Sequence, residues 1–136
     1  MATLAGLAPR APRHSQSRHD PAMAPRTIQV GSRAVATDTE GYLLDRSDWS
    51  EDFATALARE EGLMLTPDHW EVIHYLRDHY AEHGVQAQVR VMIRHFSQRW
   101  GAERGSNHAL HLMFPVGGPQ KQGNRLAGLL RTKGEH

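Results

Sequence analysis

The sequence contains no cysteine. Its absence excludes disulfide bonds, thiolate nucleophiles, persulfide carriage and every metal site that needs a cysteine ligand. Long apolar runs are missing too, so no segment can cross a bilayer as a helix. Glycine-rich phosphate loops and nucleophile elbows are also absent. The sequence therefore lacks the local signatures of an enzyme, and we expect neither catalysis nor a bound cofactor or metal.

Acidic residues are scarce at both ends of the 136-residue chain. Residues 1–26 carry a net charge of +3, and residues 119–136 also carry +3. The middle, residues 27–118, carries −5, which gives +1 in total. An acidic body with basic ends is not typical of a nucleic-acid-binding domain, whose surface is normally basic. The length suits a single small domain.

Residues 1–26 are rich in alanine, proline, arginine and serine and show no sustained periodicity. This composition predicts a disordered leader. An organelle transit peptide is the alternative, since such peptides are rich in arginine and poor in acid. The prolines interrupt the apolar core that a secretory signal needs, so we expect a cytoplasmic protein.

The pattern after the leader predicts a β-hairpin followed by helices. Apolar residues alternate on both sides of Gly31-Ser32, which suits a tight turn between two strands. A helix is expected to begin at Ser47 or Asp48 and to end at Gly62, because its apolar positions recur with a helical period.

Three further helices have clear boundaries. Thr66-Pro67 is a helix start, and Gly84 ends that helix after about residue 83. An apolar stripe predicts the next helix over residues 89–100. A short fourth helix starts near Ser106, and a final segment covers residues 120–130. We expect a mainly α fold, a small orthogonal bundle of about five helices with a β-hairpin, resembling a winged helix, and a flexible C-terminal arm.

Two histidine pairs have the spacing of metal ligands on a helix, His79 with His83 and His108 with His111. No third ligand is fixed by spacing. A solvated pair explains each case better, so we predict no metal site.

Three arginines, Arg90, Arg94 and Arg99, lie on or near the polar face of the predicted helix 89–100. They are a candidate anion or nucleic-acid face. An ordinary solvated helix face also explains them and is the favoured interpretation.

Several stretches in the body and the C-terminal arm occur in a fixed order that suggests a known family. They are Asp38-Thr39-Glu40-Gly41-Tyr42-Leu43, Trp49, Ala56-Leu57-Ala58-Arg59-Glu60-Glu61-Gly62, Leu65-Thr66, His69-Trp70-Glu71-Val72-Ile73, Val89-Arg90-Val91, Leu112-Met113-Phe114-Pro115, Gly118-Pro119 and Lys121-Gln122.

In these stretches the chain resembles the DsrC/TusE family of sulfur-relay proteins. The resemblance spans about residues 27 to 136 and implies a small helical domain over residues 27–118 with a C-terminal arm over residues 119–136. In the family the arm carries a penultimate cysteine that accepts persulfide sulfur. Members that work with dissimilatory sulfite reductase have a second cysteine eleven positions earlier, whereas members serving tRNA thiolation keep only the penultimate one.

The two cysteine positions are occupied here by Glu135 and Asn124. Neither a carboxylate nor an amide can hold a persulfide, so the resemblance implies a cysteine-less, regulatory type of member. Partner binding is expected to use the arm and the two replaced positions. The candidate partner-binding residues are Lys121, Asn124, Arg125, Arg131, Lys133 and Glu135.

Two functions follow as hypotheses. The first is a non-catalytic protein that binds sulfur-relay or sulfite-reductase partners. The second is a nucleic-acid-binding regulator of the winged-helix kind, with Arg90, Arg94 and Arg99 on a recognition helix. The acidic body argues against the second. The sequence leaves the oligomeric state and the identity of the partner open.

Overall fold

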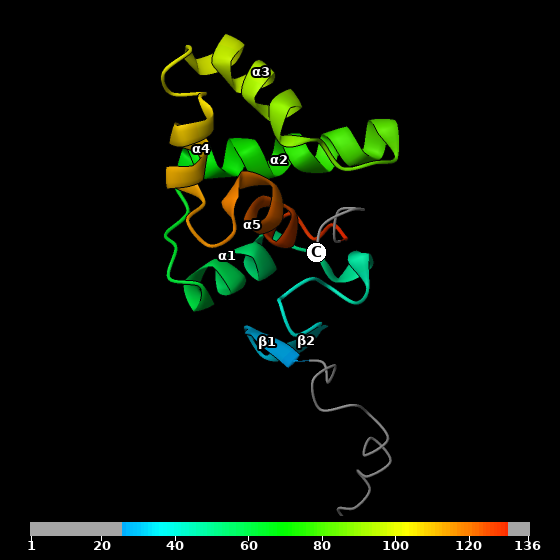
Figure 1. The fold of residues 1–136 in the computed structure, drawn as a ribbon. Helices are drawn as coiled ribbons and strands as arrows, with labels where there is room; N and C mark the ends of the chain where they lie inside the picture. The colour runs from blue at the N-terminus through cyan, green and yellow to red at the C-terminus, as the bar shows by residue number, and fades with distance from the viewer. Residues whose placement is uncertain (1–25, 131–136) are drawn as a thin grey trace, which may run out of the picture.

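The computed structural model describes residues 26–130, which fold as a β-hairpin followed by helices (Figure 1). The expected mainly helical fold with an N-terminal hairpin is confirmed. The predicted leader, apart from Arg26, lies outside the described residues. The elements are β1 (Arg26–Val30), β2 (Arg33–Thr37), the 3-10 turn η3 (Arg46–Asp48), α1 (Glu51–Glu60), α2 (Pro67–His83), α3 (Val89–Trp100), α4 (Asn107–Met113) and α5 (Gly118–Leu126).

The hairpin pairs β1 and β2 antiparallel, with Ile28 opposite Val35. Gly31 takes the turn with φ of 60°, a backbone conformation that glycine adopts without steric cost. One face of the hairpin buries its apolar residues next to α1. A 2.8 Å ion pair between Arg26 and Glu60 joins the start of β1 to the end of α1. The hairpin thus closes one end of the molecule, below α1 in Figure 1.

Local side-chain caps decide where most helices begin. Thr66 and Ser106 cap α2 and α4 as predicted, and Gly84 ends α2 in the left-handed conformation. The expected start of α1 at Ser47 or Asp48 is wrong by a few residues. Ser50 is the cap instead, because its hydroxyl accepts a 3.0 Å hydrogen bond from the Phe53 N–H.

The core is built from side chains of every helix and of the hairpin. α5 lies in its middle, in contact with α1, α2 and α4, while α3 and α4 pack at the opposite end from the hairpin (Figure 1). The largest fully buried side chains are Phe53, Phe96, Phe114, Ile28, Leu43, Leu57, Ile73, Leu76, Met92, Leu110, Leu126 and Gln122.

The segment from residue 119 to 130 differs from the prediction. It was expected to begin a loose arm, but it forms α5 and a buried continuation instead. Leu126 and Leu129 are buried, and Gly123 lets the helix approach α2 so closely that a Cβ there would lie 2.7 Å from Leu76 Cδ1. Gly123 therefore serves close packing in a segment that was expected to begin an arm. The rest of the predicted arm, residues 131–136, lies outside the described residues.

The C-terminal end of α5 is closed by a Schellman motif. The Gly128 N–H donates to the Arg125 carbonyl at 3.2 Å, and the Leu129 N–H donates to the Asn124 carbonyl at 2.9 Å. Gly128 has φ of 71°, and a Cβ at this position would lie 2.4 Å from Trp49 Cδ1. Only glycine fits, because of both the backbone conformation and the tryptophan.

Replacing Gly128 with alanine should therefore destabilise the protein more than a positive φ alone would. Strain in the left-handed region costs about 1 kcal/mol, and overpacking against Trp49 adds roughly 1–3 kcal/mol. Urea denaturation measures the free energy of unfolding. The matched control is Gly31→Ala, since Gly31 has φ of 60° but a Cβ added there would meet no atom within 4 Å. Equal losses in the two variants would contradict the close packing of Trp49 on Gly128.

Candidate functional site

The candidate site is the place where the chain leaves the folded body after α5. Residues 126–130, which we call the tail base, are held there by hydrogen bonds from side chains to backbone carbonyls. Trp49 Nε1 donates to the Leu126 carbonyl at 2.8 Å and Arg77 to the Ala127 carbonyl at 2.8 Å. Gln86 Nε2 donates to the Leu130 carbonyl at 2.9 Å. The backbone up to Leu130 is thereby held against the body.

Two arginines stack on aromatic rings, and one of them, Arg77, binds the tail base. The Arg77 guanidinium stacks 3.7 Å from the centre of the Trp49 ring, and the Arg46 guanidinium lies 4.7 Å from that of Tyr80. Burial lowers the pKa of Arg77, and the positive charge of Arg46 lowers it further, against the opposite effect of Asp78. The surroundings of the tail base are therefore cationic and aromatic.

A buried ion pair joins α5 to the end of α1. Arg125 on α5 donates through Nε to Glu61 at 3.0 Å and through a terminal nitrogen to the Val116 carbonyl at 2.7 Å. Gln122 donates to Glu61 at 2.8 Å and accepts from the Val116 N–H at 3.0 Å. Burial alone would lower the pKa of Arg125, but the hydrogen bond and charge of Glu61 outweigh it, with Tyr42 contributing, so that the pKa is raised.

The structure separates the predicted partner-binding residues. Asn124 is fully buried and Arg125 almost fully, so neither lies on an exposed arm as expected. The physical reason is that α5 turns Arg125 inward onto Glu61 and packs Asn124 into the core. Lys121 is half-buried on the surface of α5. The other three predicted residues, Arg131, Lys133 and Glu135, lie outside the described residues.

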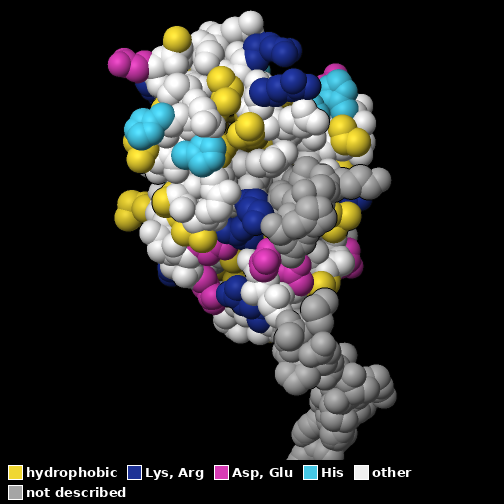
Figure 2. Space-filling model, in the orientation of Figure 1, with side chains coloured by type: hydrophobic (Ala, Val, Ile, Leu, Met, Phe, Trp, Pro, Cys, Tyr) yellow, Lys and Arg dark blue, Asp and Glu magenta, His cyan; other side chains and the backbone are white. Residues whose placement is uncertain are grey.

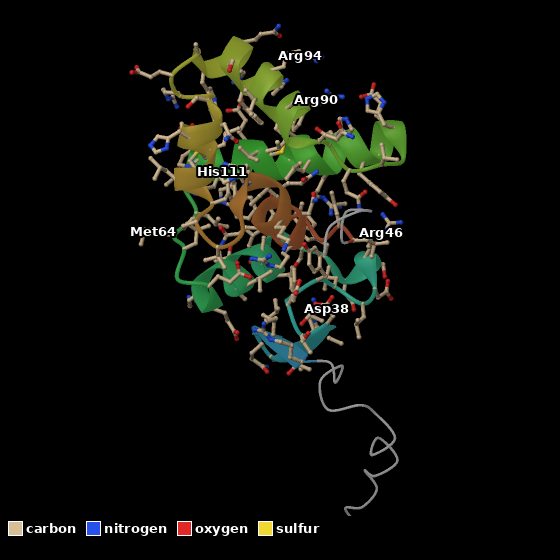
Figure 3. The ribbon with its side chains drawn as sticks, viewed as in Figure 1. Asp38, Arg46, Met64, Arg90, Arg94 and His111 are labelled. Carbon is tan, nitrogen blue, oxygen red and sulfur yellow. The ribbon has the colours of Figure 1, made fainter. Side chains whose placement is uncertain are left out.

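The predicted basic face is smaller than expected. Arg90 and Arg94 are exposed on α3 and point away from the body (Figure 3). Arg99 is also exposed, but it is ion-paired with Glu71 of α2. The face therefore consists of two arginines.

The described part of the chain, residues 26–130, holds no group of three or more side chains placed to bind a metal ion. The rings of His79 and His83 lie 4.5 Å apart, but His79 Nδ1 interacts with the Val85 carbonyl at 3.1 Å. His111 Nδ1 similarly interacts with the Asn107 carbonyl at 2.9 Å. Among the same residues, no helix is long and apolar enough to cross a membrane.

Known proteins match most of the chain. A family model described as "DsrC like protein" matches residues 29–134. The chain belongs to the DsrC-like family. Membership of the family, expected from the sequence, is thus confirmed.

The relatives of this DsrC-like chain include proteins named "Sulfurtransferase TusE". The one from Pectobacterium atrosepticum is 39% identical over 102 residues, which cover 75% of this chain and 93% of the relative. The one from Escherichia coli K12 is 40% identical over 97 residues, 71% of this chain and 88% of the relative. The chain is therefore a member of a sulfur-relay family.

Solved DsrC structures share the fold. The DsrC of Allochromatium vinosum superposes with a TM-score of 0.73 at 36% identity, covering 83% of this chain and 100% of that protein. The oxidised γ-subunit of the dissimilatory sulfite reductase (DsrC) from Archaeoglobus fulgidus superposes with a TM-score of 0.71 at 30% identity. The match covers 81% of this chain and 99% of that protein.

Sequence reasoning missed the residues that hold the tail base in this DsrC-like protein. Trp49, Arg77 and Gln86 all act on backbone carbonyls, and no sequence pattern specifies such contacts. Glu61 and Gln122 stood in the stretches that carry the family resemblance, but a glutamate before a glycine looks like a solvated helix end. Only the family resemblance offered a signal for them.

The buried pair predicts a large loss of stability when either partner is removed. Arg125→Met should lower the free energy of unfolding by roughly 3–5 kcal/mol, because Glu61 would be left buried without its counterion. Glu61→Met should have a similar effect. The double variant should lose clearly less than the sum of the two, as measured by urea denaturation.

Arg99→Met serves as the control for this cycle, since its ion pair with Glu71 is exposed to solvent. It should leave the free energy of unfolding almost unchanged. Additive losses at Arg125 and Glu61 would mean that the two side chains do not stabilise one another.

Proposed function

We propose that this protein binds partners of the sulfur-relay or sulfite-reductase type without carrying sulfur itself. The observation that carries the proposal is the combination of a DsrC-like fold with a sequence that has no cysteine. Persulfide transfer requires a polarisable thiolate, which no side chain of this sequence provides. The protein would therefore act as a non-catalytic, regulatory member beside relatives that are named sulfurtransferases.

The burial of Asn124 supports the proposal that sulfur carriage is lost at one of the two replaced cysteine positions. This residue is fully buried in the packed part of α5, and its backbone carbonyl takes part in the helix end. A thiol placed there would be shielded from a partner in the folded protein. Glu135, at the other position, remains the predicted point of approach to a sulfur-donating partner.

The surface around the tail base has the composition of a protein-binding surface. Arg46 and Arg77 supply positive charge next to aromatic rings. Val85 exposes 57% of its surface and Leu130 exposes 45%. Val85 precedes Gln86, and Leu130 supplies the carbonyl that accepts the Gln86 hydrogen bond. Arginine and apolar side chains together are typical of interfaces between proteins. We propose that partners dock here, with Lys121, Arg131 and Lys133 contributing attraction at the rim.

A nucleic-acid-binding regulator is the less favoured function. The described residues include eleven lysines and arginines against thirteen acidic residues, so the body as a whole repels phosphate. The cytoplasmic location expected from the sequence stays a prediction.

The proposal is tested by restoring one thiol. Glu135→Cys should become persulfidated by a sulfur-donating relay protein faster than the same cysteine in a free peptide of residues 127–136. The reason is that docking of the body raises the effective concentration of the tail at the donor. Intact mass spectrometry follows the gain of one sulfur atom with time.

Asn124→Cys is the matched control. Because residue 124 is fully buried, this thiol should react with neither the donor nor a small thiol reagent until the protein is unfolded. The unaltered protein should gain no sulfur. If Glu135→Cys reacts no faster than the peptide, the body does not dock on sulfur-donating partners and the proposal fails.

A further inference from the structure

Helix α3 contains three arginines and no acidic residue. Arg90 and Arg94 lie one turn apart on its exposed side, which we call the α3 arginine pair. Figure 2 shows two dark blue side chains over α3, at the place where Figure 3 labels Arg90 and Arg94. Within residues 26–130 neither side chain forms an ion pair. The pair is thus a concentrated and uncompensated positive charge.

Three other arginines of the body are compensated by carboxylates. Arg26 pairs with Glu60, Arg99 with Glu71 and Arg104 with Asp68. The α3 arginine pair differs from these three because no carboxylate of the described body faces it in an ion pair.

The pair also works against the stability of its own helix. Like charges one turn apart repel each other, and Arg90 lies in the first turn, where the helix dipole disfavours positive charge. The Arg94 charge additionally acts on Tyr75, whose pKa is raised by burial and lowered in part by Arg94. Helix stability therefore does not account for these two arginines, which points to a ligand of opposite charge.

The neighbourhood of the pair is connected to the tail base. The α2–α3 linker, residues 84–88, ends two positions before Arg90. From this linker Gln86 donates to the Leu130 carbonyl at 2.9 Å, and the Ala87 carbonyl accepts from Gln120 of α5 at 3.0 Å. Val85 in the same linker exposes 57% of its surface. A partner seated at the tail base would thus meet an apolar side chain and then the α3 arginine pair.

We propose that the α3 arginine pair binds an acidic segment of a protein partner that docks at the tail base. This inference rests on the proposed partner-binding function and adds the chemistry of the partner. A guanidinium donates two parallel hydrogen bonds to a carboxylate, so two arginines one turn apart suit two aspartate or glutamate side chains. The exposed Val85 in the linker before α3 favours a protein over a nucleic acid, because apolar contacts are typical of interfaces between proteins.

A fluorescein-labelled peptide of ten glutamates serves as the probe, with binding followed by fluorescence anisotropy. The full-length protein should bind it at low salt and release it as the salt concentration rises. The double variant R90E/R94E should bind at least about tenfold more weakly, because two attractive charges become repulsive. It should instead gain affinity for a peptide of ten lysines. Circular dichroism should show an unchanged helix content, since both side chains are exposed.

The matched control is R33E/R59E, which changes the net charge by the same amount. Arg33 in β2 and Arg59 in α1 are exposed and form no ion pair within residues 26–130. This variant should bind the glutamate peptide within about twofold of the unaltered protein, because the effect of distant exposed charges is screened. An equal loss in both variants would overturn the proposal, since net charge alone would then explain binding.

A single-stranded nucleic acid of ten nucleotides is measured in parallel. If it binds more tightly than the peptide and R90E/R94E abolishes that binding, the pair is a nucleic-acid site and the acidic-protein assignment is wrong. The test is independent of sulfur transfer. A failure of Glu135→Cys to accept sulfur would contradict docking on relay partners, whereas an unchanged affinity of R90E/R94E for the peptide would contradict only the role of the pair.

Discussion

The buried ion pair between Arg125 and Glu61 joins α5 to the end of α1. Glu61 ends α1, Arg125 lies in the last turn of α5, and both Arg125 and Gln122 bind the backbone of Val116 in the loop before α5. Removing two charges from water costs several kcal/mol for each ion, and this cost is offset only where their hydrogen bonds are complete. The geometry of α5, and with it the direction of the tail base, follows from satisfying that requirement.

The sequence predicts elements whose boundaries are local. Thr66, Gly84 and Ser106 act on residues three or four positions away, and the hairpin depends on the turn at Gly31, so these features were predicted correctly. α5 was mistaken for part of an arm. Its formation depends on contacts distant in sequence, such as the approach of Gly123 to Leu76, and a run of glycine and proline gives no sign of them.

The sequence predicted which types of residue matter at the candidate site better than it predicted where their side chains lie. The family resemblance predicts that Asn124 and Glu135 stand at the family's cysteine positions, and this assignment stays a prediction. The burial of Arg125 could not be predicted, because a charged side chain is normally exposed and its partner lies 64 residues earlier in the chain. The two remaining residues of the basic face, Arg90 and Arg94, were found from helical periodicity, which needs only local information.

The fixed tail base also sets a limit of reach. Gly128 and the three carbonyl contacts anchor the chain at Leu130, so residue 135 is tethered to a defined point of the body. Five extended residues span at most about 18 Å. Whatever residue 135 touches on a docked partner must therefore lie inside a sphere of that radius around Leu130. A cysteine-bearing relative anchored in the same way would present its sulfur within the same sphere, and the two proteins would then occupy a partner in turn rather than together.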